Sequence, residues 1–348
     1  MRAGGVWQRL TEGVPARALA ALAVLAALLL AAPVLSQLLP AGDYWLSILI
    51  LMVYFAYIGQ AWNIMMGFAG QLSLGHALYL GLGGYIAAAL YANLGVGPWL
   101  GVFAAVCIAM LAGGLIGYLG FRFSVAGVYF ALLTIAFAEF TRILFDHFKW
   151  VGASGGLFLK VEPEGSPFNL QGSPVLFYYV ILVLAALAFV FCRWLLTGRL
   201  GYYWLAIRED PEAAQAAGIN VFRYKMLAVL ISSGLTALGG VWSAFYYKNL
   251  FPESAFSMGR SIEVTLAPII GGLGTLVGPI LGSALLVGLG DLFTTMAERL
   301  AEYGIKAGGL KQIGYGVALL LIVMFRREGV WPWLAHWLGF DRHRENQP

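Results

Sequence analysis

Charged residues are scarce in this sequence of 348 residues. Only 11% are Asp, Glu, Lys or Arg and 61% are hydrophobic, whereas an average soluble domain is about 25% charged and 45–50% apolar. The mean hydropathy is +0.81. So few polar side chains cannot cover the surface of soluble domains of this length. The composition therefore excludes a soluble protein and indicates an integral membrane protein.

Cysteine and the common signatures of catalysis are also scarce. Cys107 and Cys192 both lie in apolar runs and define no disulfide framework. The sequence has no Gly-x-x-x-x-Gly-Lys-[Ser/Thr] phosphate loop, no catalytic triad and no acid pair placed for hydrolysis. No second His or acid stands at helical spacing from His76 to make a metal site. We therefore expect a chain that is not an enzyme and binds no cofactor or metal itself. Nucleic acid is not an expected partner, because the net charge of +4 comes from basic residues at the ends of apolar segments.

The sequence does contain a series of apolar runs, which reach about 20 residues and lack the period-two alternation of barrel strands. They predict an all-α, polytopic transmembrane helical bundle of about ten transmembrane helices. The third run is rich in glycine, and the eighth is short enough to be a partial span. The predicted crossings are 18–39, 44–66, 70–91, 98–119, 124–145, 174–196, 225–248, 261–272, 277–297 and 310–325.

The distribution of Lys and Arg predicts the orientation. With the N-terminus inside, the cytoplasmic segments hold 13 of the 21 basic residues, which favours a cytoplasmic N-terminus and C-terminus. A cleaved secretory signal is the alternative for the first run, but the uninterrupted apolar stretch from Ala18 to Leu35 is long for one. The predicted parts are a cytoplasmic N-terminal segment 1–17, a transmembrane domain 18–325 with an outer loop 146–173 and an inner loop 197–224, and a cytoplasmic C-terminal tail 326–348.

The inner loop contains the pattern of a short capped helix. Asp210 suits the N-cap and Pro211 suits the first helical position. Four alanines between 213 and 217 favour helix, and Gly218 suits a left-handed C-terminal cap. Such a helix is roughly 10 Å long, too short to span a bilayer. A rigid helix with small side chains suits docking into a groove of another protein; the alternative is that it only orders the loop.

The spacing Glu212-Ala-Ala-x-x-x-Gly218 resembles the signature of importer permeases of the ATP-binding-cassette (ABC) class. In that class the helix fits a cleft on the ATPase and transmits its closure. No Ile-x-Leu-Pro follows the glycine, so the chain departs from the signature downstream. The resemblance implies a short cytoplasmic coupling helix. The residues expected to couple to the ATPase are Arg208, Glu209, Asp210, Glu212, Ala213, Ala214 and Gly218.

The turn between the second and third predicted crossings is polar and rich in glycine. Gly67, Gly70 and Gly75 weaken the helix there. Because lipid does not tolerate loose backbone, such a break is expected to be buried in protein or to line a wet cavity. Its polar side chains could contact a solute, or they could bond across packed helices. Glu263, in the short eighth run, could likewise contact a solute or pair with Arg260. The candidates for the translocation pathway are Asn63, Gln71, Ser73, His76 and Glu263.

Three segments in this order resemble the branched-chain amino-acid permease family of the LivM and LivH type: Gly67–Ala77, Gly201–Asp210 and Gly271–Gly282. The long outer loop and the basic C-terminal tail resemble the LivM branch more than the LivH branch. The resemblance implies a transmembrane permease subunit of an ABC importer with a type II-like fold. Its expected cargo is branched-chain, hydrophobic amino acids, and its expected location is the bacterial plasma (inner) membrane.

The resemblance also implies partners. These are a second, LivH-like permease subunit, two cytoplasmic ATP-binding subunits that use ATP, and an extracytoplasmic solute-binding protein. Membrane lipid would surround the assembly. Two alternatives remain open: a permease for urea or another small amide or amino-acid solute, since the urea branch carries similar motifs, and a different class, an ion-coupled secondary carrier or a passive channel.

Overall fold

The computed structural model describes residues 16–38, 40–160, 169–303, 309–326 and 328–337. Most of the predicted segments 1–17 and 326–348, and part of the predicted outer loop, lie outside the described residues. The regular secondary structure of these residues is helical apart from one small two-stranded sheet. The predicted all-α membrane bundle is therefore confirmed.

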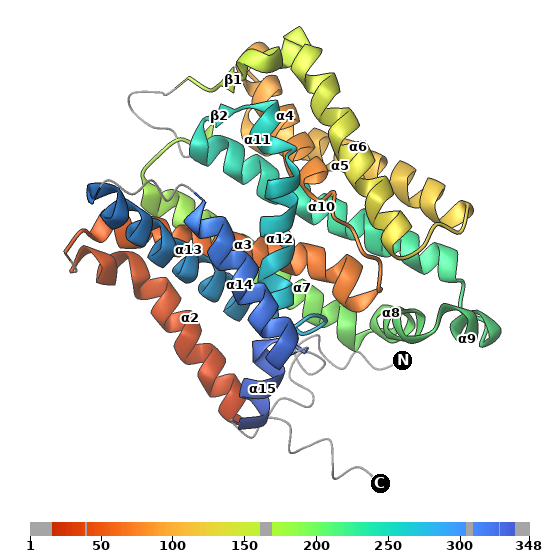
Figure 1. The fold of residues 1–348 in the computed structure, drawn as a ribbon. Coiled ribbons are helices and arrows are strands. Elements are labelled where there is room, and N and C mark those ends of the chain that lie inside the picture. The colour runs from red at the N-terminus through yellow and green to blue at the C-terminus, as the bar shows by residue number, and fades with distance from the viewer. Residues whose placement is uncertain (1–15, 39, 161–168, 304–308, 327, 338–348) are drawn as a thin grey trace, which may run out of the picture.

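Most of the helices are long (Figure 1). In the first half of the chain they are α2 (Ala16–Gln37), α3 (Gly42–Asn63), the π-helix η1 (Ile64–Phe68), α4 (Ala77–Leu94), α5 (Pro98–Arg122), α6 (Val128–His147), η2 (Lys149–Val151) and η3 (Ala153–Gly155). In the second half they are α7 (Pro174–Thr197), α8 (Arg199–Glu209), α9 (Pro211–Ala216), α10 (Val221–Tyr247), α11 (Pro252–Ala255), α12 (Met258–Gly271), α13 (Gly278–Glu302), α14 (Leu310–Phe325) and α15 (Val330–Trp337). The strands are β1 (Leu157–Phe158) and β2 (Asn249–Leu250).

Seven helical segments of the described chain are long and apolar enough to cross a membrane, fewer than the ten crossings predicted. They comprise α3 with η1, and α4, α5, α6, α7, α10 and α13. The described parts of α2 and α14 contain only shorter apolar stretches, Ala23–Gln37 and Gln312–Ile322, which are not counted among the seven. The eighth predicted crossing corresponds to α12, which has only 14 residues and contains Pro268.

The third predicted crossing begins at residue 70, seven residues before the corresponding helix α4 begins. The chain leaves α3 through the widened turn η1, and Gly70 has a φ of +69°. Residues 70–76 are not helical, so α4 begins at Ala77 rather than near residue 70. A left-handed residue interrupts the helical hydrogen-bond pattern, and glycine adopts that conformation without steric cost.

The core lies where α3, α4 and α10 pack together. These three segments are mostly buried, whereas α5, α6, α7 and α13 expose most of their residues on the outside of the chain. Small residues permit the close packing: a Cβ added at Gly83 would collide with the Ala237 carbonyl, and one at Gly240 with the Leu80 carbonyl. Close backbone approach through small residues is how helices associate in lipid, where the hydrophobic effect drives little packing between them.

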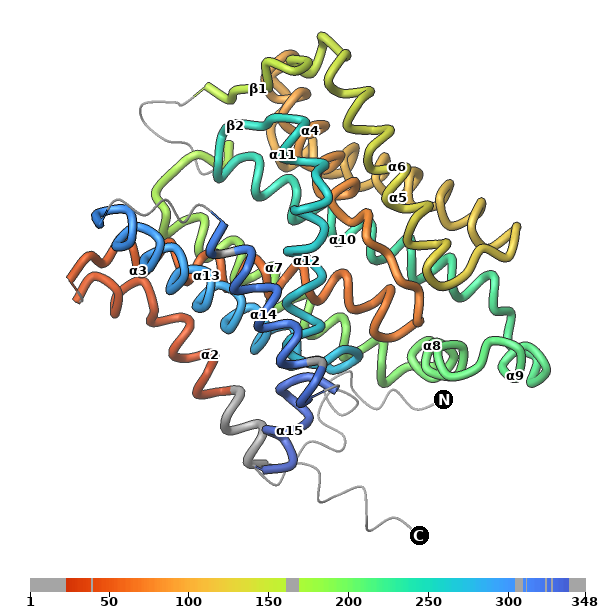
Figure 2. The backbone as a smooth tube through the Cα atoms, viewed as in Figure 1, coloured from red at the N-terminus to blue at the C-terminus, as the bar shows by residue number. Residues whose placement is uncertain are grey.

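The two ends of the bundle differ. At one end β1 and β2 pair antiparallel, Leu157 opposite Leu250, with α11 following β2. At the other end lie α8 and α9, well away from the sheet (Figure 2). We call these the strand end and the α9 end. The helices between them carry the chain from one end to the other.

Candidate functional site

The helix α9 has the caps that its sequence predicts. The Asp210 carboxylate accepts hydrogen bonds from the backbone N–H groups of Glu212 (2.8 Å) and Ala213 (3.0 Å). Pro211 is its first residue. Gly218, just beyond the helix, has a φ of +86°. The expected short helix with an Asp N-cap and a left-handed glycine after it is therefore present, although α9 itself covers only Pro211–Ala216.

Most of α9 faces away from the rest of the chain. Ala214 is the buried residue of the helix, with 5% of its surface exposed, and it anchors the helix to the bundle. Glu212, Ala213 and Gly218 are exposed. A short, capped helix with one buried contact leaves room on its other faces for another protein.

Arg208 joins the end of α8 to the broken segment after α3. Its Nη1 atom donates to the Gly67 carbonyl at 2.7 Å, across 141 positions of sequence. The same side chain pairs with Glu209, whose carboxylate lies 3.0 Å from Nη2 and is largely exposed. A Cβ at Gly70 would lie 2.9 Å from Arg208 Cγ, so a side chain there would meet Arg208. Arg208 therefore contacts its own chain, three residues before α9 begins.

The loop between α12 and α13 meets the same place. Asn63, the last residue of α3, accepts from the Gly274 N–H (2.9 Å) through Oδ1 and donates to the Thr275 carbonyl (2.9 Å) through Nδ2. A Cβ at Gly274, whose φ is +76°, would lie 2.6 Å from Arg208 Nη1. We call Asn63, Gly67, Arg208, Gly274 and Thr275 the junction. Gly67, Arg208, Gly274 and Thr275 come from the three sequence segments that resemble the permease family. Asn63 lies four residues before the first of these segments.

The other polar residues of the glycine-rich turn are buried and bonded to their own chain. His76, fully buried, contacts Ser73 Oγ (3.0 Å) through Nδ1 and Ser232 Oγ (2.9 Å) through Nε2. Ser232 in turn donates to the Ala61 carbonyl at 2.7 Å. Gln71 donates to the Ala69 carbonyl at 2.8 Å. The sequence predicts that this break is either buried in protein or lines a wet cavity, and in this conformation it is buried. The pathway role of Asn63, Gln71, Ser73 and His76 stays a prediction.

Glu263 pairs with Arg260, the alternative to solute contact that its spacing allowed. The distance from Arg260 Nη1 to Glu263 Oε2 is 3.2 Å, and Arg260 Nη2 also donates to Tyr54 Oη at 3.3 Å. The Arg260 guanidinium lies over the rings of Tyr54 and Phe55, 5.6 and 5.7 Å from their centroids. An aromatic face attracts a guanidinium, which holds Arg260 in one place.

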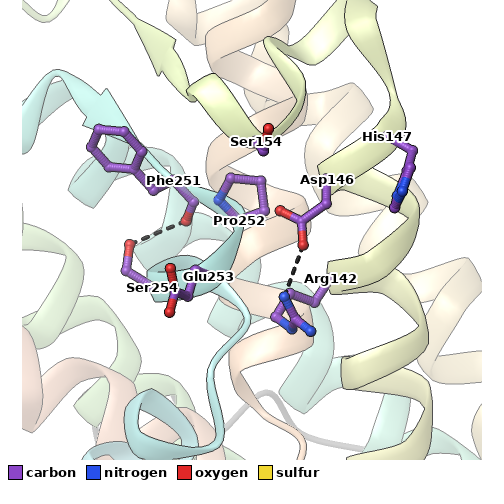
Figure 3. Close-up of a pocket in the computed structure, with 8 residues that line it drawn as sticks. All are labelled: Arg142, Asp146, His147, Ser154, Phe251, Pro252, Glu253 and Ser254. Atoms are coloured by element: carbon purple, nitrogen blue, oxygen red, sulfur yellow. Dashed lines mark hydrogen bonds and ion pairs between the residues drawn. The ribbon is translucent and has the colours of Figure 1, made fainter.

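A cavity of about 770 Å³ opens at the strand end between α6, η3 and α11 (Figure 3). Within it Arg142 lies 2.8 Å from Asp146, and it also pairs with Glu139. Glu139 and Arg142 are three residues apart, the spacing of neighbours on one face of a helix. The lining residues are Arg142, Asp146, His147, Ser154, Phe251, Pro252, Glu253 and Ser254.

Three contributors to these sites, Ser232, Thr275 and Tyr54, were not among the sequence-based candidates. Thr275 stands inside the segment Gly271–Gly282, so its motif was visible although its contact with Asn63 was not. Ser232 was detectable only as a polar residue in an apolar run. Tyr54 carries no local signal, because its partner Arg260 is 206 positions away.

Comparisons with known proteins agree with this architecture. Residues 44–325 match the family described as "Branched-chain amino acid transport system / permease component". The chain is 28% identical over 305 residues to the high-affinity branched-chain amino acid transport system permease protein LivM of Escherichia coli, covering 81% of this chain and 68% of LivM. It is 23% identical to the probable branched-chain amino acid transport permease protein LivM of Methanocaldococcus jannaschii, covering 84% of this chain and 91% of that protein.

A shorter similarity, 32% over 136 residues, links the chain to the nucleoside ABC transporter permease protein NupC of Lactococcus lactis, covering 39% of this chain and 38% of NupC. No solved structure gives a significant match. The family match extends over most of the chain, from α3 to α14, and so includes α9, the junction and the Arg260–Glu263 pair. The chain is thus a multi-pass membrane protein that belongs to the family of permease components of branched-chain amino acid transport systems.

Proposed function

We propose that this chain is one of two permease subunits of an ATP-driven ABC importer for branched-chain, hydrophobic amino acids. Two cytoplasmic ATP-binding subunits would supply the energy, and an extracytoplasmic binding protein would deliver the solute. The importer would lie in the plasma membrane of a bacterium, with the α9 end and both termini on the cytoplasmic side. The homology to LivM proteins supports the cargo class.

The observation that carries the proposal is the exposed, capped helix α9 attached to the junction. A separate ATPase needs a rigid handle on the permease, and α9 offers one with a single buried residue, Ala214. Movement of α9 must also be transmitted to the transmembrane helices. Arg208, at the base of α9, bonds to the Gly67 carbonyl at the end of the broken segment.

The mechanism follows from these contacts. ATP binding closes the ATPase pair, and α9 moves with the groove that holds it. Through Arg208 the movement reaches η1 and, through Asn63, the loop before α13. One is a π-helical turn and the other a loop, and such segments bend at lower cost than a continuous α-helix because fewer regular backbone hydrogen bonds must break. The bundle therefore changes the side to which it opens while the continuous helices move as rigid rods.

Reconstitution tests the proposal. The chain is purified from membranes of cells that also express its neighbouring transport subunits, placed in proteoliposomes with them, and assayed for uptake of leucine, isoleucine, valine and urea. We expect ATP-dependent uptake of the three amino acids and co-purification of ATPase subunits. Uptake by this chain alone without ATP would overturn the proposal in favour of a secondary carrier or a channel. Uptake of urea but of none of the three amino acids would overturn the assignment of the cargo.

The variant Glu212→Lys tests the role of α9 directly. Glu212 is exposed, and its charge lies at the positive end of the helix dipole. We expect normal membrane insertion with loss of ATPase co-purification and of uptake. The matched control is Glu302→Lys, an exposed acid at the C-terminal end of α13, which is expected to leave both unchanged.

A further inference from the structure

A second open cavity, of about 200 Å³, lies between α3, α4, α10, α11 and the first turn of α12. It is separate from the strand-end cavity of Figure 3, although Ser254 of α11 borders both. We call it the Arg260 cavity. Its lining residues are Tyr54, Leu80, Gly81, Ser243, Tyr247, Asn249, Leu250, Ser254, Ala255 and Arg260.

The Arg260 cavity has one charged group on its wall. Of the lining residues only Arg260 carries a charge, and its side chain is 25% exposed. A guanidinium has five N–H donors in a planar fork that matches a carboxylate. Tyr54 and Glu263 accept from two of its nitrogens, and the aromatic rings of Tyr54 and Phe55 hold its plane. Arg260 is therefore fixed in orientation at a cavity wall with donor capacity in excess of these two contacts.

The helix that carries Arg260 strengthens the positive potential. Ser257 caps α12 by accepting from the Arg260 N–H at 3.1 Å, so Arg260 lies in the first turn. The amino end of a helix is the positive end of its dipole. Glu263 leaves the pair neutral as a whole, with the positive member at the cavity wall and the negative member one turn further along α12. Only the positive member lines the cavity, so the cavity wall presents N–H donors that suit a carboxylate.

The remaining walls suit an apolar side chain. Leu80, Leu250 and Ala255 provide aliphatic surface, and Tyr54 and Tyr247 provide ring surface. An apolar cavity of about 150 Å³ is enough to hold benzene, so about 200 Å³ accommodates a small aliphatic amino acid. Charged and apolar walls together match a solute that has a charged head and a hydrocarbon tail.

We propose that the Arg260 cavity is a solute site of the permease, in which the carboxylate of a zwitterionic amino acid binds the Arg260 guanidinium and its aliphatic side chain packs against Leu80 and Leu250. This inference rests on the proposed import function for the identity of the solute. The site would give a role to an arginine–glutamate pair in a short helix of a membrane bundle, where ionised groups are costly.

Protection of an introduced thiol tests the site. The importer is placed in nanodiscs without nucleotide, and this chain carries Cys107→Ser to remove its exposed cysteine. Cys192 is retained because it is buried. Ser243→Cys puts a nearly isosteric thiol on the cavity wall, and its rate of reaction with a maleimide is measured against L-leucine or L-leucinamide, which lacks the carboxylate. We expect leucine to slow the reaction and leucinamide to have little effect.

Two matched controls locate the effect. Ser154→Cys places a thiol in the strand-end cavity, where leucine is expected to give no protection. Arg260→Gln is expected to raise the leucine concentration for half-protection by about tenfold or more, because a charge-assisted bidentate contact is lost, and Arg260→Lys by less. Arg142→Gln removes an arginine that also pairs with a glutamate three residues away, and it is expected to change nothing at Ser243→Cys.

The outcomes separate the two proposals. Equal protection by leucine and leucinamide, or none by leucine, overturns the Arg260 site, and the leucinamide comparison does so without any change at Arg260. Failure of the unaltered importer to take up branched-chain amino acids with ATP overturns the proposed function. In that case the protection assay still decides whether the cavity binds a carboxylate.

Discussion

Arg208 Nη1 donates a hydrogen bond to the carbonyl oxygen of Gly67 at 2.7 Å. The two residues lie 141 positions apart, one at the base of the exposed helix α9 and the other in the widened turn that ends α3. This contact makes the base of α9 mechanically continuous with the centre of the bundle. Movement of α9 is therefore expected to reach the centre of the bundle through Arg208.

Replacing Arg208 with alanine is expected to uncouple the importer. A hydrogen bond from a charged group contributes about 1.5–3 kcal/mol, so its loss loosens α9 from η1 without unfolding the bundle. We expect ATP hydrolysis to continue while the amount of leucine taken up per ATP falls by about tenfold. Parallel assays of uptake and phosphate release in proteoliposomes measure this ratio. Arg199→Ala, at the opposite end of α8 and exposed, is the control; a ratio unchanged in Arg208→Ala would argue against the linkage.

The N-cap of α9 gives a second prediction. Asp210→Ala removes the acceptor for two backbone N–H groups, and such a change costs roughly 0.5–2 kcal/mol of helix stability. Asp210→Asn keeps the acceptor and changes the charge. Amide hydrogen exchange of residues 212–217 is expected to accelerate in the alanine variant and to change little in the asparagine variant. Equal exchange in both would show that α9 does not depend on its cap.

Gly218 supplies the third prediction. Its φ of +86° is strained for other residues, but a Cβ there would meet no atom within 4 Å. Only backbone conformation opposes substitution, so Gly218→Asn is expected to retain uptake, since asparagine tolerates this region. Gly218→Pro cannot adopt a positive φ, and we expect normal insertion with loss of ATP-driven uptake. Wild-type uptake by the proline variant would count against a coupling role for α9.

Helix packing in the core gives a fourth prediction. Gly83→Ala places a methyl group against the Ala237 carbonyl of α10, and overpacking of this kind costs about 1–3 kcal/mol. The thermal unfolding midpoint of the purified chain in detergent is expected to fall. Gly288→Ala in α13, where a Cβ meets nothing within 4 Å, is expected to leave the midpoint unchanged or to raise it slightly. Similar midpoints for the two variants would refute close α4–α10 packing.

Local interactions explain what could be predicted from sequence. The caps of α9 involve residues within eight positions of one another, and each follows from the chemistry of Asp, Pro, Ala and Gly. The pairs Glu139–Arg142 and Arg260–Glu263 follow from three-residue spacing on a helix. The apolar runs predicted a membrane bundle because lipid requires long helices.

Long-range contacts explain what could not be predicted. The start of α4 depends on the π-helical turn η1 and on the left-handed conformation of Gly70, neither of which the hydropathy of the run reveals. The junction forms from residues separated by 141 to 212 positions. The Arg260 cavity likewise needs walls from six helical and strand elements, and no periodicity indicates which residues line it.

The short helix α12 has a consequence for the insulation of the membrane. Its 14 residues rise about 21 Å at 1.5 Å per residue, whereas the hydrocarbon layer is about 30 Å thick. The partly exposed guanidinium groups of Arg260 and Arg208 lie near its opposite ends. We therefore expect the insulating layer between these two charges to be thinner than the full hydrocarbon layer, so that a voltage across the membrane falls over a shorter distance beside α12.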